Sequence, residues 1–275
     1  MRVVICAMAK NEHLYINEWV RHYVNLGVDK IYLYDNDEID SPNVADFIDN
    51  DLKEYVCIID IRGQKGVNMQ HKIYTKFYNT FKDDFDWCLF CDIDEYLFGI
   101  QNFKSWLMQP KLKNAKQIRV KWKLFGDSGY IRRDMTKSVV ETFTKEVKTT
   151  YNRALTKKAN LQNQAKCILR GGMINVKFFS AHFACFGSQD RMILSMLPSG
   201  KWCFSGVTLK EDYKGESVYL HHYMTKSLSE FVAQKLNRND AVFNTSIPLT
   251  YYWRINEKTT EKLEYLKNLG LLEQE

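Results

Sequence analysis

Residues 87–98 read WCLFCDIDEYLF, and this stretch decides how the rest of the chain is interpreted. Residues 87–91 are mostly apolar, and the next four positions contain three carboxylates, Asp92, Asp94 and Glu95. Carboxylates crowded against a buried segment repel one another and lose hydration, so the arrangement is costly unless a positive group lies among them. The stretch therefore predicts a buried strand that ends beside a positive charge.

Length and composition indicate a globular chain with a large core. The chain has 275 residues, of which 45% are hydrophobic and 14% aromatic, and it contains no internal repeat or convincing linker. No apolar run approaches the roughly 18 to 20 residues that a membrane span needs. The start, MRVVICAMAKNE, is typical of a first buried strand rather than a signal peptide, and the odd set of seven cysteines favours reduced thiols and a cytoplasmic location.

The charge is unevenly distributed along the chain. Residues 1–100 carry 10 Lys and Arg against 18 Asp and Glu, a net charge of −8, and the remainder carries 29 against 15, a net charge of +14. One interpretation is an ordinary solvated surface. The other is that the basic second half, especially around residues 153–170, faces a diphosphate, a lipid pyrophosphate or an anionic membrane at which the protein is peripherally held.

Strand and helix patterns alternate through the first hundred residues. Strands are expected at RVVICAM (2–8), KIYLYDN (30–36), YVCIIDIRG (55–63) and WCLFCDIDEY (87–96). Helices are expected from an Asn11 cap to Gly27, around NVADFIDNDL (43–52), and at HKIYTKFYNTFKDDF (71–85). The alternation predicts an α/β fold, a Rossmann-like and mostly parallel sheet covered by helices on both faces.

The carboxyl ends of these four strands are polar or acidic: AKNE, YDND, DIRG and DIDE. Ligands of parallel sheets gather at this edge, so the pattern predicts a ligand site, although turns that follow strands are polar in any case.

The pattern loosens after residue 100. Residues 118–125 (IRVKWKLF) predict a half-exposed strand followed by the turn GDSG, and 176–187 (VKFFSAHFACFG) predict another strand. Residues 151–166 fit either a basic helix or a loop. SLSEFVAQKL is expected to be a helix, with Ser227 and Glu230 at capping-box spacing.

The D-x-D in CDIDEY has the chemistry of a metal–diphosphate site. On a strand Asp92 and Asp94 would point to the same side, and paired carboxylates bind hard divalent cations. A neutral imidazole could complete such a site and would favour Mn²⁺ over Mg²⁺; the candidates are His222, its neighbour His221, and His182. Cys88 and Cys91 are instead expected to be buried apolar fillers.

Several common nucleotide and hydrolase motifs are missing from the sequence. It has no G-x-G-x-x-G after a strand, no P-loop and no G-x-S-x-G. These gaps weigh against Rossmann-type hydride transfer, P-loop phosphoryl transfer and serine hydrolysis.

The ordered set of motifs resembles family 92-like glycosyltransferases, relatives of the large family 2. The set comprises AKNEHLYINEWVRHYVNLGVDKIYLYDND, the DIDEY strand end, WKLFGDSG, SAHFA and HHYMTKSLSEFVAQK. The resemblance implies a GT-A fold and a metal-dependent hexosyltransferase that uses a nucleotide sugar, with UDP as the expected nucleotide, and inverts the anomeric carbon. It also implies a glycan or lipid-linked saccharide acceptor, as in polysaccharide or capsule biosynthesis, and no nucleic-acid partner.

The resemblance spans residues 1–240 and leaves 241–275 as a helical C-terminal extension. It divides the spanned part into a nucleotide-binding half, residues 1–100, and an acceptor-side half, residues 101–240, and the C-terminal part of the fold is expected to be smaller and less regular.

The resemblance also assigns individual residues. The donor-binding set is Lys10, Asn11, Glu12, Asp35, Asn36, Gln70 and Asp92, and the set for Mn²⁺ or Mg²⁺ is Asp92, Asp94 and His222. Ser227, Phe231 and Lys235 match a trailing helix whose role is structural.

An inverting transfer needs a carboxylate base for the acceptor hydroxyl. Asp127, in the turn after a strand, is the first candidate, and Glu95 and Asp212 are the others. Two other classes remain open at this point: a non-catalytic protein that binds a nucleotide sugar or glycan, and a metal-dependent nuclease or phosphatase.

Overall fold

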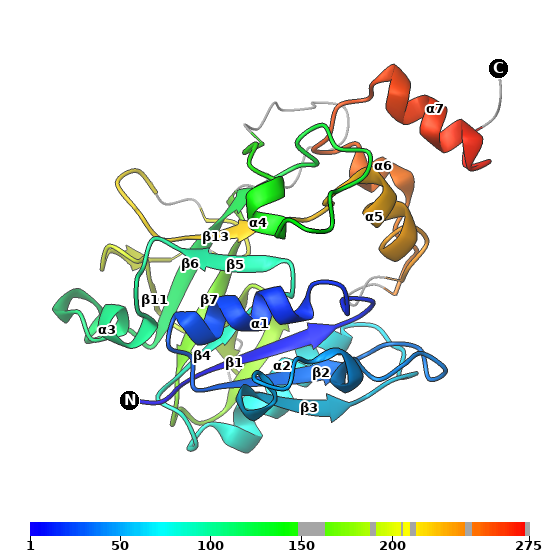
Figure 1. Cartoon of the computed structure of the whole chain (residues 1–275). Helices are drawn as coiled ribbons and strands as arrows, with labels where there is room; N and C mark the ends of the chain where they lie inside the picture. The colour runs from blue at the N-terminus through cyan, green and yellow to red at the C-terminus, as the bar shows by residue number, and fades with distance from the viewer. Residues whose placement is uncertain (148–162, 188–190, 205, 210–212, 240–243, 273–275) are drawn as a thin grey trace. The chain divides into compact units, whose positions relative to one another are not determined.

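The computed structural model describes all residues except 148–162, 188–190, 205, 210–212, 240–243 and 273–275 (Figure 1). It is a mixed α/β protein with two compact units. The first unit comprises Met1–Trp122, Ala159–His221 and Ala241–Asn244, and the second comprises Lys123–Lys158, His222–Asp240 and Thr245–Glu275. No helix in the described part of the chain is long and apolar enough to cross a bilayer.

A large sheet dominates the first unit. Its main path runs β12-β11-β6-β7-β4-β1-β2-β3, and β13 pairs with β5 and β6. The strands are β1 (Val3–Ala9), β2 (Lys30–Asp35), β3 (Val56–Asp60), β4 (Trp87–Phe90), β5 (Glu95–Phe98), β6 (Gln117–Leu124), β7 (Ala165–Arg170), β11 (Ser195–Met196), β12 (Trp202–Cys203) and β13 (Tyr219–His222). Strands β4, β1, β2 and β3 are mutually parallel, as the sequence predicts.

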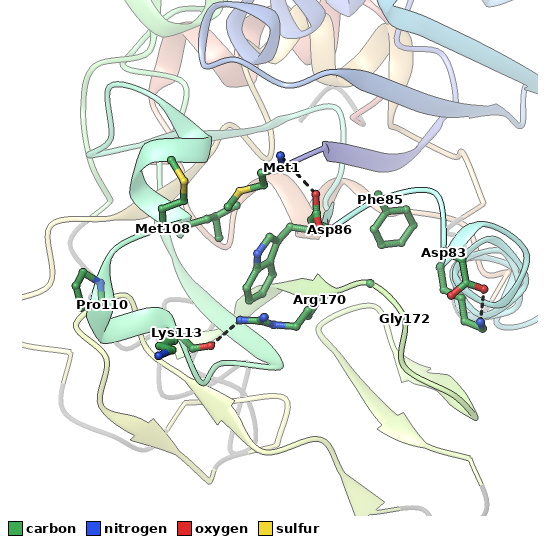
Figure 2. A pocket seen from close by; sticks show the side chains of 13 residues that line it. Met1, Asp83, Phe85, Asp86, Met108, Pro110, Lys113, Arg170 and Gly172 are labelled. Atoms are coloured by element: carbon green, nitrogen blue, oxygen red, sulfur yellow. Dashed lines mark hydrogen bonds and ion pairs between the residues drawn. The ribbon is translucent and has the colours of Figure 1, made fainter.

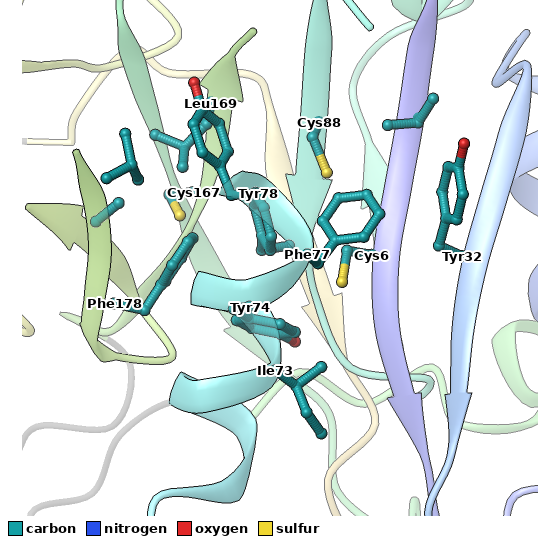
Figure 3. Packing of buried hydrophobic residues seen from close by; sticks show 14 of the residues in the cluster. Cys6, Tyr32, Ile73, Tyr74, Phe77, Tyr78, Cys88, Cys167, Leu169 and Phe178 are labelled. Carbon is teal, nitrogen blue, oxygen red and sulfur yellow. The ribbon is translucent and has the colours of Figure 1, made fainter. Parts of the chain in front are cut away.

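Two helices cover opposite faces of these parallel strands (Figure 1). Helix α2 (Met69–Phe81) packs Tyr74 and Phe77 against Cys6, Cys88 and Cys167, which project from three neighbouring strands (Figure 3). Helix α1 (Ile16–Asn25) lies on the other face and buries Trp19 and Tyr23. Cys88 and Cys91 are buried free thiols, which agrees with the prediction that they are apolar fillers.

The remaining elements of the first unit are short. They are η1 (Val44–Phe47), η2 (Lys53–Tyr55), α3 (Phe103–Leu107), η3 (Pro110–Leu112) and an antiparallel sheet of β8 (Val176–Ser180), β9 (Phe183–Phe186) and β10 (Arg191–Met192). Residues 176–187 therefore form a hairpin rather than the single predicted strand, because the chain turns at Ala181 and His182.

Two further expectations were wrong in detail. Asn11 does not cap α1: the helix begins after Tyr15, and Asn11 takes a left-handed conformation with φ 56°. The segment 43–52 forms the 3-10 turn η1, which Asn43 caps, rather than an α-helix.

Among its described residues, the second unit holds four short helices: α4 (Val139–Thr142), α5 (Leu228–Gln234), α6 (Leu249–Tyr252) and α7 (Thr260–Asn268). Leu228, Phe231, Tyr252 and Leu266 form its small apolar core. Ser227 and Glu230 make the predicted capping box at the start of α5, in which each side chain bonds the other residue's backbone N–H.

Candidate functional site at the carboxyl edge of the sheet

The order β3-β2-β1-β4 contains a topological switch point. The chain runs from β1 outward to β2 and β3, and then returns to place β4 on the other side of β1. The loops that leave β1 and β4 therefore diverge, and ligands of open parallel sheets bind in the crevice at such a point. Lys10, Asn11 and Glu12 follow β1, and Asp92, Asp94 and Glu95 follow β4.

The D-x-D lies in a turn and not on a strand. Strand β4 ends at Phe90, and the N–H of Glu95 donates to the carbonyl of Asp92 at 3.1 Å, which closes a four-residue turn before β5 begins. The prediction that strand alternation aligns Asp92 with Asp94 was wrong, because the pleat has ended before either residue.

A buried lysine supplies positive charge to two of the three carboxylates, Asp92 and Glu95, where the sequence led us to expect a divalent cation in that role. Lys166, near the start of β7, is 1% exposed, and its Nζ lies 2.7 Å from Oδ2 of Asp92 and 3.8 Å from Oε1 of Glu95. Burial alone would lower the pKa of Lys166, but Asp92 and Glu95 outweigh it and raise that pKa above the ordinary value, so the amine stays charged. The sequence interpretation missed Lys166; its one signal is a charged residue inside the apolar strand AKCILR.

Gln70 holds the other oxygen of Asp92. Its Nε2 donates to Asp92 Oδ1 and also contacts the hydroxyl of Tyr74, which in turn donates to the carbonyl of Cys91 at 3.2 Å. Gln70 and Asp92 are thus brought together as the resemblance implies. The Asp92 side chain is 34% exposed, so one face of this anchored carboxylate remains open to a ligand.

Glu95 occupies a different environment. It is 0% exposed, and its Oε2 accepts from the backbone N–H of Asp92 at 3.0 Å. Its carbonyl accepts from the indole of Trp19 and the hydroxyl of Tyr23, each at 2.9 Å. Burial raises the pKa of the Glu95 carboxyl well above its ordinary value, while Lys166 opposes the shift. The enclosed Glu95 carboxylate is positioned to stabilise the turn and not to accept a proton from an acceptor hydroxyl.

The loops after β1 and β2 are joined to each other. Asp35 is fully buried and accepts from the N–H groups of Asp37 and Val44, and Asp37 accepts from the N–H of Asn11. Burial raises the pKa of Asp37, and the hydrogen bond from Asn11 opposes that rise. These contacts fix the donor-side loops that contain Asn11 and Asp35; Asp37 itself was not among the predicted residues.

Asn36 is the residue in this region whose side chain is left unsatisfied. It is 7% exposed, and its Oδ1 has no hydrogen-bond partner among the residues that the structure describes. A buried carbonyl oxygen without a donor costs about 1–3 kcal/mol, so a ligand N–H or O–H at this position would be favoured. Lys10 instead pairs with Glu38 at 3.0 Å, and Glu12 is 6% exposed.

His182 lies near Lys166. Its Nδ1 is 3.0 Å from the carbonyl of Ala165, which makes Nδ1 the protonated nitrogen of the neutral ring. Burial, together with the charge of Lys166, lowers the pKa of His182 to about 3. The imidazole therefore stays neutral near pH 7 with its Nε2 lone pair available, the form in which histidine binds metal ions.

Of the other predicted residues, Asp127 and His222 belong to the second unit, His221 ends a segment of the first, and Asp212 lies outside the described residues. Asp127 is ion-paired with the buried Lys262 and also accepts from the Tyr252 hydroxyl and the N–H of Gly129. His222 is 5% exposed, whereas His221, in the first unit, stacks on Phe98 with ring centroids 4.3 Å apart.

The residues of the first unit fit a divalent cation only as a partial site. Among described residues, no group of three or more His, Cys, Asp or Glu side chains is arranged to hold a metal. The partly exposed Asp92 can supply one carboxylate, whereas Asp94 is 5% exposed; Mg²⁺ or Mn²⁺ is often held by one or two carboxylates with substrate phosphates. Metal binding is therefore expected to depend on the donor, in competition with Lys166.

A hollow of about 890 Å³ lies at the opposite end of the parallel strands (Figure 2). Its lining includes Met1, which precedes β1, and Trp87, which begins β4, and the guanidinium of Arg170 lies over the Trp87 ring at 4.7 Å. The Asp86 carboxylate there pairs with the N-terminal amine. Because this is the amino edge of the sheet, the hollow is separate from the acidic site.

No protein-family model matches the chain, and no curated protein is significantly similar to it. The resemblance to family 92-like glycosyltransferases therefore rests on the motifs alone.

Proposed function

We propose that this chain is a glycosyltransferase that binds a nucleotide sugar at the carboxyl edge of its parallel sheet and transfers the sugar to a glycan or lipid-linked saccharide. The expected nucleotide is UDP and the expected outcome at the anomeric carbon is inversion. The observation that carries the proposal is that the Lys10–Glu12 loop and the anchored Asp92 turn flank the switch point between β1 and β4.

The nucleoside is proposed to lie over the loops after β1 and β2. Asn36 offers a buried amide oxygen that has no donor, and the Asp37–Asn11 hydrogen bond keeps its loop in place. A base or ribose group that donates to this oxygen would recover the hydrogen bond that the amide lacks.

The diphosphate is proposed to lie beside Asp92. When bound there between the diphosphate and the two aspartates, Mn²⁺ or Mg²⁺ would act as a Lewis acid for the leaving group. Gln70 and Lys166 hold the Asp92 carboxylate in one orientation before the donor arrives, and a bound metal would compete with Lys166 for that carboxylate. Asp127 remains the proposed base.

The test is a screen of nucleotide sugars against the protein and two variants, Asp92→Asn and Asp94→Asn. Donor binding is followed calorimetrically with and without Mn²⁺, and turnover by release of the nucleoside diphosphate. Each variant removes one charge at constant volume and should lower turnover at least 100-fold. Asp92→Asn also takes a counter-charge from the buried Lys166, so its stability should fall, and the unfolding temperature is measured beside turnover. Asp83→Asn, an exposed carboxylate at the amino edge, is the matched control. Normal turnover in both variants would reject the site.

A binding protein without turnover is the second candidate. It is favoured by the lysines already paired with the two proposed catalytic carboxylates, Lys166 with Asp92 and Lys262 with Asp127. Such a protein would bind donor with the same dependence on Asp92 but release no nucleoside diphosphate, even over long incubation. A metal-dependent nuclease or phosphatase would instead cleave labelled DNA or a phosphomonoester in the same assays.

A further inference from the structure

The free edge of the large sheet exposes an apolar surface. Strand β12 is the last strand on the main path, and it pairs only with β11 among the strands that the structure describes. On β12 and its continuation, Trp202 is 43% exposed, Cys203 is fully buried and Phe204 is 70% exposed. Alternate side chains of a strand share a face, so the two aromatic rings lie on the same outward side.

The partner strand adds to this surface. Strand β11 pairs Ser195 with Cys203, and the same antiparallel register continued by one residue places Leu194 opposite Phe204. Leu194 is 43% exposed, whereas Ser195 is fully buried. We call Leu194, Trp202 and Phe204 the edge surface.

Exposed lysines border the edge surface. Lys201 directly precedes Trp202, and the hairpin tip at Gly200 packs so closely on η3 that a Cβ added there would lie 2.9 Å from the Cβ of Lys111. Lys111 and Lys201 are exposed, and in the described part of the chain neither makes an ion pair.

The sequence around these lysines contains no acid. Residues 96–126 include seven Lys and Arg and not one Asp or Glu, and residues 192–204 likewise contain no Asp or Glu. An apolar face with exposed aromatic rings and bordering lysines is complementary to the interface of an anionic bilayer. The rings enter the headgroup region, and each lysine gains from the negative surface potential.

We propose that the edge surface docks the protein on anionic membrane. This surface differs from residues 153–170, where the sequence suggested a membrane contact and which lie mostly outside the described residues. The inference does not rest on the proposed transferase activity, because the predicted property is binding to lipid.

The test is flotation of the full-length protein with vesicles of phosphatidylcholine alone and with about one third phosphatidylglycerol. The wild-type protein should float with the anionic vesicles at low salt and much less with neutral ones. Trp202→Ser/Phe204→Ser should lower binding at least tenfold, because both rings leave the interface. Lys111→Gln/Lys201→Gln should lower it by on the order of fivefold for each lysine, and this loss should shrink as salt is added.

Two matched control variants test whether the loss of any two exposed apolar side chains, or of any two exposed lysines, lowers binding to vesicles. Ile174→Ser/Phe179→Ser removes two other exposed apolar side chains, and Lys53→Gln/Lys76→Gln removes two other exposed lysines. Both control proteins should float like the wild type. The proposal is overturned if the wild type does not float, if the edge variants bind as well as the controls, or if Trp202→Ser/Phe204→Ser merely converts a dimer to a monomer in sedimentation without altering flotation.

Discussion

Each unit of the molecule buries a lysine against an aspartate. The two pairs differ in the number of carboxylates near the lysine and in the exposure of the aspartate. In the second unit Lys262 meets Asp127 alone, both side chains are under 10% exposed, and Lys262 also donates to the carbonyl of Glu257 at 3.1 Å. In the first unit Lys166 serves Asp92 and Glu95 together, and Asp92 is 34% exposed. A closed pair suits a structural role, whereas a pair whose aspartate is partly exposed suits contact with a ligand.

The largest effect is expected for Asp127→Asn, which tests whether the Lys262–Asp127 pair is also catalytic. If Asp127 is the base, Asp127→Asn should reduce turnover by roughly 10²–10⁴-fold with donor affinity unchanged. The variant also leaves Lys262 buried without its counter-charge, so stability falls as well. Asp127→Asn/Lys262→Met removes both charges and should recover stability but not turnover, measured by urea unfolding and nucleotide release. Recovery of turnover in the double variant would leave Asp127 a purely structural role.

Lys262→Met breaks the Lys262–Asp127 pair itself. This substitution leaves the Asp127 carboxylate buried with the Tyr252 hydroxyl but without a cation, and it should cost about 3–5 kcal/mol of unfolding free energy. Lys145→Met, an exposed lysine of the same unit, is the control and should change stability by no more than about 0.5 kcal/mol. Comparable losses in the two variants would mean that the buried pair contributes nothing special.

Substitution of Lys166, which pairs with Asp92, should change the affinity of the first unit for Mn²⁺. Lys166→Met leaves Asp92 and Glu95 without their internal cation, so Mn²⁺ should bind on the order of 10–100-fold more tightly in the absence of donor. Titration calorimetry measures this affinity, and melting with Mn²⁺ or with chelator gives a second readout. Lys116→Met is the control. If Lys166→Met does not fold, Lys166→Met/Glu95→Gln removes one charge of each sign, and unchanged Mn²⁺ affinity in whichever variant folds would show that Lys166 and metal do not compete.

The smallest expected effect concerns a buried group outside both pairs. Burial lowers the pKa of His22 from 6.5 to about 4, although a hydrogen bond to the Leu97 carbonyl opposes the shift. The unfolded chain therefore binds a proton that the folded chain refuses, and the unfolding free energy should fall as pH drops from about 6.5 to 4. At pH 5 the loss from this residue is roughly 1–2 kcal/mol.

Urea unfolding of the wild type and His22→Phe at pH 7 and pH 5 measures this contribution. His22→Phe loses the hydrogen bond at both pH values, so only the difference between the two pH values is informative. The variant should lose less stability on acidification than the wild type, and equal losses would contradict the assignment.

The periodic segments of the sequence were interpreted correctly where burial has a regular period. The strands β1 to β4, the helix α2 and the α5 capping box follow from local apolar spacing and side-chain chemistry. Errors arose where the chain leaves regular structure. We predicted strand alternation for the DIDE segment and a helix cap at Asn11. The structure has a turn and a left-handed residue there, and a short stretch of sequence indicates neither clearly.

The sequence by itself determined a parallel α/β core with polar residues at the carboxyl ends of its strands, and it showed that the carboxylates of 92–95 require a positive charge. Only the tertiary structure decided that Lys166, 74 residues from Asp92, provides that charge, and that Asp127 is closed by Lys262, 135 residues away. The physical reason is the separation along the chain between the residues that interact. Hydrophobic periodicity acts between near neighbours and appears in any window of sequence, whereas an ion pair depends on the positions of two distant elements, which strand order alone sets.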